Sequence, residues 1–219
     1  MPALLFDLDG TMLVSDHLHE AVFRDLWTER GLPVYDGFYV EQIHGRINAD
    51  IFAEFLPDEP DPVALSERKE AMFRARLPRP YPAMPGVADL IALADAKGWG
   101  RAIVTNAMRK NAEAMLAAIG LRDAFDTIVI GEECARGKPH PDPYLEAMRL
   151  LGERPEDCIA FEDSPSGVRA AAASGAFTIG IRSELDDAAL RAAGANATVQ
   201  DFTDPALASY LARLEGPHT

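Results

Sequence analysis

Short runs of apolar residues recur along the chain, and most of them end in polar or acidic residues. Uninterrupted runs of this kind are typical of strands that are buried on both faces of a sheet. They predict strands at residues 3–8, 101–104, 127–130, 158–161, 177–181 and 197–199. Helical periodicity predicts helices between most of them, at residues 87–97, 111–119, 143–151, 167–173 and 187–193. Strands that alternate with helices in this way predict an α/β fold, with a Rossmann-like parallel sheet flanked by helices.

Residues 15–81 break this alternation. Helical patterns occur near residues 16–30, 36–43, 48–56 and 62–77, and no run in this stretch is typical of a strand. Four prolines within residues 77–86 then favour a stiff, extended connection that leads back to the sheet. We therefore expect a small all-helical domain, residues 15–81, inserted into an α/β domain formed by residues 1–14 and 82–219.

The net charge of the chain limits the classes of partner that it is expected to bind. Its 219 residues are 48% hydrophobic, enough for a sizeable core, and 21 Lys+Arg against 35 Asp+Glu give a net charge of −14. Because a protein this acidic repels phosphate backbones and anionic membrane surfaces, neither nucleic acid nor a membrane is an expected partner. A small anion can still bind where positive charge is concentrated locally or where a metal ion is recruited.

The N-terminus and the cysteines predict the compartment. Acidic residues at Asp7 and Asp9 interrupt the apolar N-terminal segment, which is therefore unlike a signal peptide, and no apolar run is long enough to span a membrane. The two cysteines, Cys134 and Cys158, fit neither a disulfide framework nor a metal-binding spacing, which favours a reducing compartment. We expect a cytoplasmic monomer or small homo-oligomer.

Polar side chains lie where four of the predicted strands end. In an open parallel sheet, ligands bind at the carboxyl ends of the strands, so these side chains are expected at one edge. They are Asp7 and Asp9 after the first strand, Thr105 and Asn106 after the second, Lys138 after the third, and Glu162 and Asp163 after the fourth. Two carboxylates about 4 Å apart repel each other by roughly 4 kcal/mol at an effective dielectric constant near 20. A hard dication with oxygen ligands, above all Mg²⁺, would relieve this repulsion and admit an anionic substrate.

The spacing of Asp7 and Asp9 suits phosphoryl transfer. Residues i and i+2 of a strand share a face, so both carboxylates can address one reacting centre. One can attack phosphorus while the other gives a proton to the leaving oxygen and then takes one from water. Two acids at this spacing are also typical of a solvated strand end. The lysine, hydroxyl and amide on the neighbouring strand ends favour the catalytic interpretation.

Four segments carry a family resemblance. FDLDGT, VTN, GKPHPDPY and FEDSPSGVRAA resemble, in order, the four motifs of the haloacid dehalogenase-like superfamily, and the helical insert resembles its subclass I cap domain. The resemblance implies Asp7 as the nucleophile that forms an aspartyl-phosphate, and Asp9 as the general acid and base. It implies phosphoryl contacts from Thr105 and Lys138, with Asn106 beside them. It further implies that Mg²⁺ is held by Asp7, the Asp9 backbone carbonyl and Asp163, with Glu162 either a direct ligand or a partner of the ligands.

The same motifs distinguish between the chemistries of that superfamily. Its dehalogenases lack an acid two residues after the nucleophile, because a halide leaves without a proton and without a metal. Asp9, together with the acidic pair Glu162 and Asp163, therefore implies phosphate ester substrates. The expected activity is Mg²⁺-dependent hydrolysis of a small phosphorylated metabolite, such as a sugar phosphate. A non-catalytic protein that binds such a metabolite is a further hypothesis, although none of the catalytic positions is missing.

A phosphomutase is the main alternative, because the chain also resembles β-phosphoglucomutase and its related sugar phosphatases. In the mutases, a histidine at the position of His19 couples cap closure to the acid/base aspartate; an exposed helix residue is the plain alternative. The mutases hold a second phosphate with a lysine where this chain has Met108, and with an arginine in the cap. Arg46 is one candidate for that arginine, but alignment places Asn48 there. Arg46 is otherwise a surface charge and Asn48 a helix cap. These departures favour hydrolysis.

Overall fold

A computed structural model describes residues 1–43 and 46–215 of the chain. The chain divides into two compact units. One consists of Met1–Val14 and Arg79–Thr219 and contains the sheet, and the other is the helical segment Ser15–Pro78. We call them the sheet unit and the helical unit.

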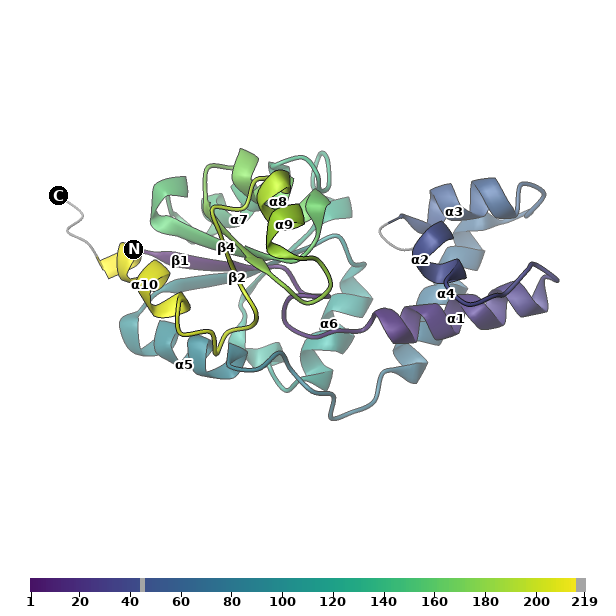
Figure 1. The fold of residues 1–219 in the computed structure, drawn as a ribbon, viewed down its shortest axis with the longest axis horizontal. Coiled ribbons are helices and arrows are strands. Elements are labelled where there is room, and N and C mark those ends of the chain that lie inside the picture. The colour runs from purple at the N-terminus through teal and green to yellow at the C-terminus, as the bar shows by residue number, and fades with distance from the viewer. Residues whose placement is uncertain (44–45, 216–219) are drawn as a thin grey trace. The chain divides into compact units, whose positions relative to one another are not determined.

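Within the described residues, the sheet unit is built on six parallel strands in the order β3-β2-β1-β4-β5-β6. Figure 1 labels β1, β2 and β4 of this sheet. The strands are β1 (Ala3–Phe6), β2 (Gly100–Thr105), β3 (Thr127–Ile130), β4 (Cys158–Glu162), β5 (Phe177–Ile181) and β6 (Ala197–Val199). Phe6 of β1 pairs with Ile103 of β2 on one side and with Phe161 of β4 on the other. The carboxyl ends of these three strands therefore lie at one edge, and the predicted parallel α/β sheet is confirmed.

The sheet unit also contains helices. They are α5 (Val87–Lys97), α6 (Arg109–Ala118), α7 (Asp142–Leu151), α8 (Pro165–Ala173), α9 (Asp187–Ala193) and α10 (Leu207–Leu211). Single 3-10 turns form η1 (Arg122–Ala124), η2 (Gly131–Glu133), η3 (Pro155–Asp157) and η4 (Ala212–Glu215). Helix α7 packs on β1, β2 and β3, and α8 packs on β4 and β5. The buried side chains of α7 and of the strands beneath it form a continuous apolar core.

The helical unit contains α1 (Asp16–Glu29), α2 (Phe38–Gln42), α3 (Asn48–Phe55) and α4 (Pro62–Arg76). Helix α4 packs against both α1 and α3. The core of this unit is aromatic: Trp27 and Phe23 are buried, and their rings meet edge to face with centroids 5.3 Å apart. Asp61 accepts a hydrogen bond from the backbone N–H of Ala64 and so begins α4 as its N-cap.

Several boundaries differ from those predicted, and two of the differences have a structural cause. Strand β1 ends at Phe6 instead of Leu8, because the chain turns there: Met12 and Leu13 both donate backbone hydrogen bonds to the Leu8 carbonyl. The second boundary between the units falls before Arg79, three residues earlier than the one expected from the prolines. Tyr81 donates backbone and hydroxyl hydrogen bonds to the carbonyls of Ala118 and Val14, at 2.9 and 2.6 Å, which ties this segment to the sheet unit. Among residues 1–43 and 46–215, no helix is both long enough and apolar enough to cross a membrane.

Candidate active site

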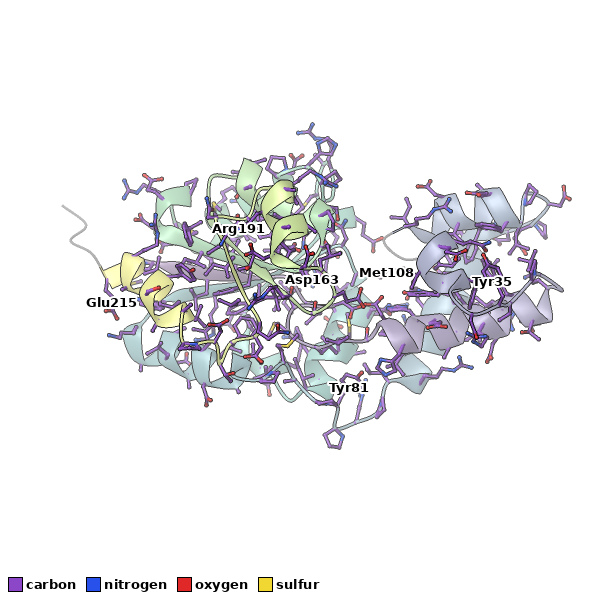
Figure 2. All side chains as sticks on the ribbon, viewed as in Figure 1. Tyr35, Tyr81, Met108, Asp163, Arg191 and Glu215 are labelled. Atoms are coloured by element: carbon purple, nitrogen blue, oxygen red, sulfur yellow. The ribbon has the colours of Figure 1, made fainter. Side chains whose placement is uncertain are left out.

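Three carboxylates meet at the carboxyl edge of the sheet. Asp7 directly follows β1, Glu162 ends β4, and Asp163 begins the next loop, where it is labelled in Figure 2. One oxygen of each lies within 4.8 Å of the others. The register of β1 with β4 explains this meeting, because it aligns Phe6 with Phe161 immediately before the acids. These three oxygens form the acidic part of the candidate active site.

Glycines make room for two of these carboxylates. A Cβ atom at Gly10 would lie 2.0 Å from Oδ2 of Asp163, and one at Gly167 would lie 2.0 Å from the carboxylate atoms of Glu162. Gly10 also has a positive φ of 84°, a backbone conformation that favours glycine. On its other oxygen, Asp163 accepts a hydrogen bond of 3.0 Å from the hydroxyl of Thr11. The positions of both acids therefore depend on neighbours without a side chain.

Lys138 supplies positive charge among the acids. Its Nζ atom lies 2.6 Å from Oδ1 of Asp7, 2.5 Å from Oε1 of Glu162 and 2.7 Å from the backbone oxygen of Val104. These three acceptors match the three hydrogens of the ammonium group. Its side chain is only 3% exposed, so water does not screen these contacts. Lys138 thus joins the strand ends of β1, β2 and β4.

Asn106 holds the loop that carries Lys138. Its Oδ1 accepts a hydrogen bond from the backbone N–H of Lys138, and its Nδ2 donates one to the carbonyl of the same residue, both at 3.1 Å. A Cβ atom at Gly131 or at Gly137 would approach Oδ1 of Asn106 to 2.1 or 3.0 Å. The sequence predicted that Asn106 lies beside the phosphoryl oxygens but missed this contact with Lys138.

Tyr144 is a member of the site that sequence reasoning missed. Its hydroxyl donates a 2.7 Å hydrogen bond to Oε1 of Glu162, and both side chains are fully buried. Burial and the charges of Glu162 and Asp7 raise the pKa of Tyr144 well above its ordinary value. The hydroxyl therefore stays protonated and is the donor of this hydrogen bond. Tyr144 is the last residue of the motif GKPHPDPY, which was the available signal.

The acids are not balanced by Lys138 alone. The pKa of Asp7 is raised to about 7: burial is the largest cause, Lys138 partly offsets it, and the charges of Glu162 and Asp9 add to it. Burial and the charges of Asp7 and Glu162 likewise raise the pKa of Asp163 well above its ordinary value. Raised pKa values mean that the ionised carboxylates repel one another in a site of low polarity. A cluster of carboxylate oxygens that needs a cation fits a hard dication such as Mg²⁺.

Asp9 and Thr105 are the remaining predicted site residues near the carboxyl ends of the strands. Asp9 is half-buried in the turn after β1, and its charge raises the pKa of Asp7 and of Tyr81. The hydroxyl of Thr105, at the end of β2, accepts a 3.1 Å hydrogen bond from the backbone N–H of Ala107. Its own hydrogen is therefore available to an acceptor such as a phosphoryl oxygen.

His19 and Asn48 are half-buried members of a polar cluster in the helical unit, which also contains the buried Lys69 and Glu70. The ring of His19 stacks on Phe73 with centroids 3.9 Å apart, and its Nδ1 lies 2.9 Å from Nζ of Lys69. Asn48 donates a 2.7 Å hydrogen bond to Glu70, which pairs with Lys69 at 2.9 Å. The interpretation of His19 as an exposed helix residue is therefore wrong.

Of the two plain alternatives, the helix cap is wrong for Asn48, and the surface charge is confirmed for Arg46, which is exposed. Asn48 is not a helix cap, because α3 begins with Ile47 as its N-cap and Asn48 as its first residue. Arg46 pairs with Glu54 at 2.6 Å and donates to the carbonyl of Gln42 at 2.9 Å. Substrate contacts by His19, Arg46 and Asn48 stay predictions.

The chain is similar to known hydrolases in sequence and in structure. A family model described as haloacid dehalogenase-like hydrolase matches residues 1–175. Fructose-1-phosphate phosphatase YqaB of Escherichia coli is 33% identical over 82% of this chain and 95% of its own length. Validoxylamine A 7'-phosphate phosphatase of Streptomyces hygroscopicus is 31% identical over 91% of this chain and 93% of its own length. Among solved structures, a HAD hydrolase of family IA, variant 3, from Entamoeba histolytica superposes with a TM-score of 0.87 at 26% identity, covering 99% of this chain and all of the other.

Proposed function

Because the chain belongs to the haloacid dehalogenase-like hydrolase family, as its motifs suggested, and is a phosphomonoester hydrolase, we propose that it is a Mg²⁺-dependent phosphatase of a small phosphorylated metabolite, such as a sugar phosphate. We propose further that it acts through an aspartyl-phosphate formed on Asp7. The observation that carries this proposal is the position of Asp7, which contacts Lys138 at 2.6 Å and lies within 4.8 Å of two further carboxylates.

In the proposed reaction, a carboxylate oxygen of Asp7 attacks phosphorus, and the bond from phosphorus to the ester oxygen breaks. Asp9 gives its proton to the departing alcohol. Asp9 then takes a proton from the water that attacks the aspartyl-phosphate, which releases inorganic phosphate and restores Asp7. Lys138 brings its positive charge close to the phosphoryl oxygens, and Thr105 donates a hydrogen bond to them, where negative charge must be stabilised during transfer.

The donor set supports a metal site beside Asp7. Asp7, Asp163 and the backbone carbonyl of Asp9 would hold Mg²⁺, which when bound supplies positive charge to the phosphoryl group. Glu162 is engaged differently, since its Oε1 already accepts hydrogen bonds from Lys138 and Tyr144. We therefore propose that the main role of Glu162 is to bind Lys138.

Two positions disfavour the mutase alternative. Met108, labelled in Figure 2, stands where that resemblance implies a lysine for a second phosphate. The next residue, Arg109, is bound to Glu133 by hydrogen bonds of 2.7 and 2.6 Å and also donates to the carbonyl of Ile128. Neither side chain is therefore placed to hold a second phosphate in the way that the mutases do.

The names of the relatives support the proposed substrate class. Both curated relatives carry names of phosphatases, one for fructose 1-phosphate and the other for validoxylamine A 7'-phosphate. A phosphorylated sugar or a similar alcohol ester is thus the proposed substrate. We also propose that the protein acts in the cytoplasm, since Cys134 and Cys158 are free thiols.

Phosphate release from p-nitrophenyl phosphate and from a panel of sugar phosphates tests this function. We expect turnover with Mg²⁺, none with a chelator, and recovery when Mg²⁺ is restored. Absence of phosphate release from every ester would overturn the proposal. Conversion of β-glucose 1-phosphate into glucose 6-phosphate with a bisphosphate primer would instead establish the mutase.

A further inference from the structure

We propose that Tyr144 is a positioning residue for Lys138 and acts on it through Glu162, an inference that rests on the proposed function. One oxygen, Oε1 of Glu162, accepts both the 2.7 Å hydrogen bond from the Tyr144 hydroxyl and the 2.5 Å contact from Nζ of Lys138. The three groups form a buried chain that ends on Asp7, 2.6 Å from the ammonium. Tyr144 itself touches none of the reacting atoms.

The need for this hydroxyl follows from the charges around Lys138. Two carboxylates, Asp7 and Glu162, compete for one ammonium group whose third hydrogen goes to the carbonyl of Val104. With no other donor, the full charge of Oε1 would face Lys138 and draw it away from Asp7. The Tyr144 hydroxyl takes up part of the acceptor capacity of that oxygen. The ammonium therefore stays shared with Asp7, beside the phosphorus that Asp7 is proposed to attack.

The surroundings keep the chain of contacts fixed. The Tyr144 side chain belongs to the same buried apolar cluster as Val104, Ala147 and Met148. Glu162 cannot retreat toward α8, because it fills the space that a side chain at Gly167 would need. Lys138 and Tyr144 lie six residues apart on one segment of the chain. Lys138 is in the loop before α7, and Tyr144 is in the first turn of α7. A hydrogen bond to a charged group in such a setting is stronger than one at the surface.

The variant Tyr144→Phe removes the hydroxyl and keeps the ring. We expect its kcat for p-nitrophenyl phosphate with Mg²⁺ to fall about tenfold or more, with KM changed by less than about threefold, since the lost hydrogen bond is to a charged group that acts during transfer. Tyr35→Phe is the matched control, because it removes a 2.9 Å hydroxyl-to-carboxylate bond to Glu41 in the helical unit. It should leave both constants within about twofold. A Tyr144→Phe kcat within about twofold of wild type would overturn the inference.

A double-mutant cycle separates positioning from packing. In a Glu162→Gln background the hydroxyl no longer moderates a charge, so adding Tyr144→Phe should lower kcat by less than about twofold. An equal tenfold loss in both backgrounds would point to packing alone and contradict the proposal.

Crystal structures of Mg²⁺-loaded wild type and Tyr144→Phe give a readout that does not depend on turnover. We expect Nζ of Lys138 to stay near Glu162 and to leave hydrogen-bond distance of Asp7 in the variant. An unchanged set of contacts would refute positioning. If wild type released no phosphate from any ester, the proposed function would fail, while these structures would still decide the role of Tyr144.

Discussion

The side-chain amide of Asn106 makes two hydrogen bonds with the backbone of Lys138. It accepts one from the N–H and donates one to the carbonyl, each at 3.1 Å. The lysine ammonium must meet Asp7, Glu162 and Val104 at once, so a small displacement of its backbone would break several contacts. Asn106 thereby links the end of β2 to the loop that follows β3.

Asn106→Ala is therefore expected to lower kcat at least about tenfold, because the loop that positions Lys138 loses two hydrogen bonds. The control is Asn196→Ala, which removes a 2.8 Å bond to the backbone N–H of Thr178 elsewhere in the sheet unit. Both variants should lose about 1 to 3 kcal/mol of unfolding free energy. Denaturant unfolding and steady-state kinetics check this; equal kcat values for the two variants would count against the role of Asn106.

Gly10→Ala is expected to abolish high-affinity Mg²⁺ binding. A Cβ at this position would lie 2.0 Å from the Asp163 carboxylate, which would have to leave the cluster. Gly120→Ala is the control, since Gly120 has a similar positive φ of 73° but nothing within 4 Å of the added atom. Both substitutions cost roughly 1 kcal/mol or more in backbone strain. Titration calorimetry with Mg²⁺ should show loss of binding in Gly10→Ala alone.

Many helices and strands could be predicted from the sequence, because each depends on a pattern of residues close together in the chain. Buried parallel strands require uninterrupted apolar runs, so β3, β5 and β6 have the predicted bounds. Helix α10 was missed because five residues are too short to show a helical period. Strand β1 was predicted two residues too long, since Leu8 is as apolar as the strand although the chain has already turned.

The gathering of the acids was also predictable, because parallel strands bring their carboxyl ends to one edge. The partners of those acids were not. The contact of Tyr144 with Glu162 spans 18 positions, and that of Asn106 with Lys138 spans 32. Such contacts depend on how α7 and the loops pack, which no periodicity records. The same holds for Lys69, whose contact with His19 joins α4 to α1 across 50 positions.

The Lys69–Glu70 pair makes the helical unit sensitive to acid. Burial alone would raise the pKa of Glu70, but the charge and hydrogen bond of Lys69, with smaller contributions from His19 and Asn48, lower it below its ordinary value. A carboxyl group with a lowered pKa in the folded state stabilises the protein above its unfolded pKa, and this stabilisation is lost as the pH falls through the folded value. Glu70 therefore contributes stability at neutral pH.

Glu70→Gln should lower the unfolding free energy at pH 7 by about 3 kcal/mol, because it leaves the buried Lys69 without its counter-charge. The difference from wild type should shrink as the pH falls below about 4. Glu29→Gln is the control: its pair with Arg68 is exposed, so little change is expected at either pH. Denaturant unfolding at several pH values decides, and a difference that did not vary with pH would contradict the linkage.

Asp9→Asn should slow the two half-reactions unequally, and by an amount that depends on the leaving group. An alkyl phosphate needs a proton on the departing oxygen, which asparagine cannot give. p-Nitrophenolate is a stable anion and leaves without one, so formation of the aspartyl-phosphate from this ester should be affected far less. Hydrolysis of the aspartyl-phosphate needs a base in either case. The variant should therefore accumulate phosphorylated Asp7 from p-nitrophenyl phosphate.

Rapid-quench mixing of Asp9→Asn with p-nitrophenyl phosphate measures this directly. We expect a burst of about one p-nitrophenol per active site followed by turnover at least about a hundredfold slower than in wild type, as for removal of a general base. Mass spectrometry of the quenched protein should find the phosphoryl group on Asp7. Asp7→Asn is the control and should give neither burst nor turnover, because the attacking oxygen is gone. A burst in Asp7→Asn would mean that another residue is the nucleophile, while a slow first step with p-nitrophenyl phosphate in Asp9→Asn would show that Asp9 positions the substrate instead of moving protons.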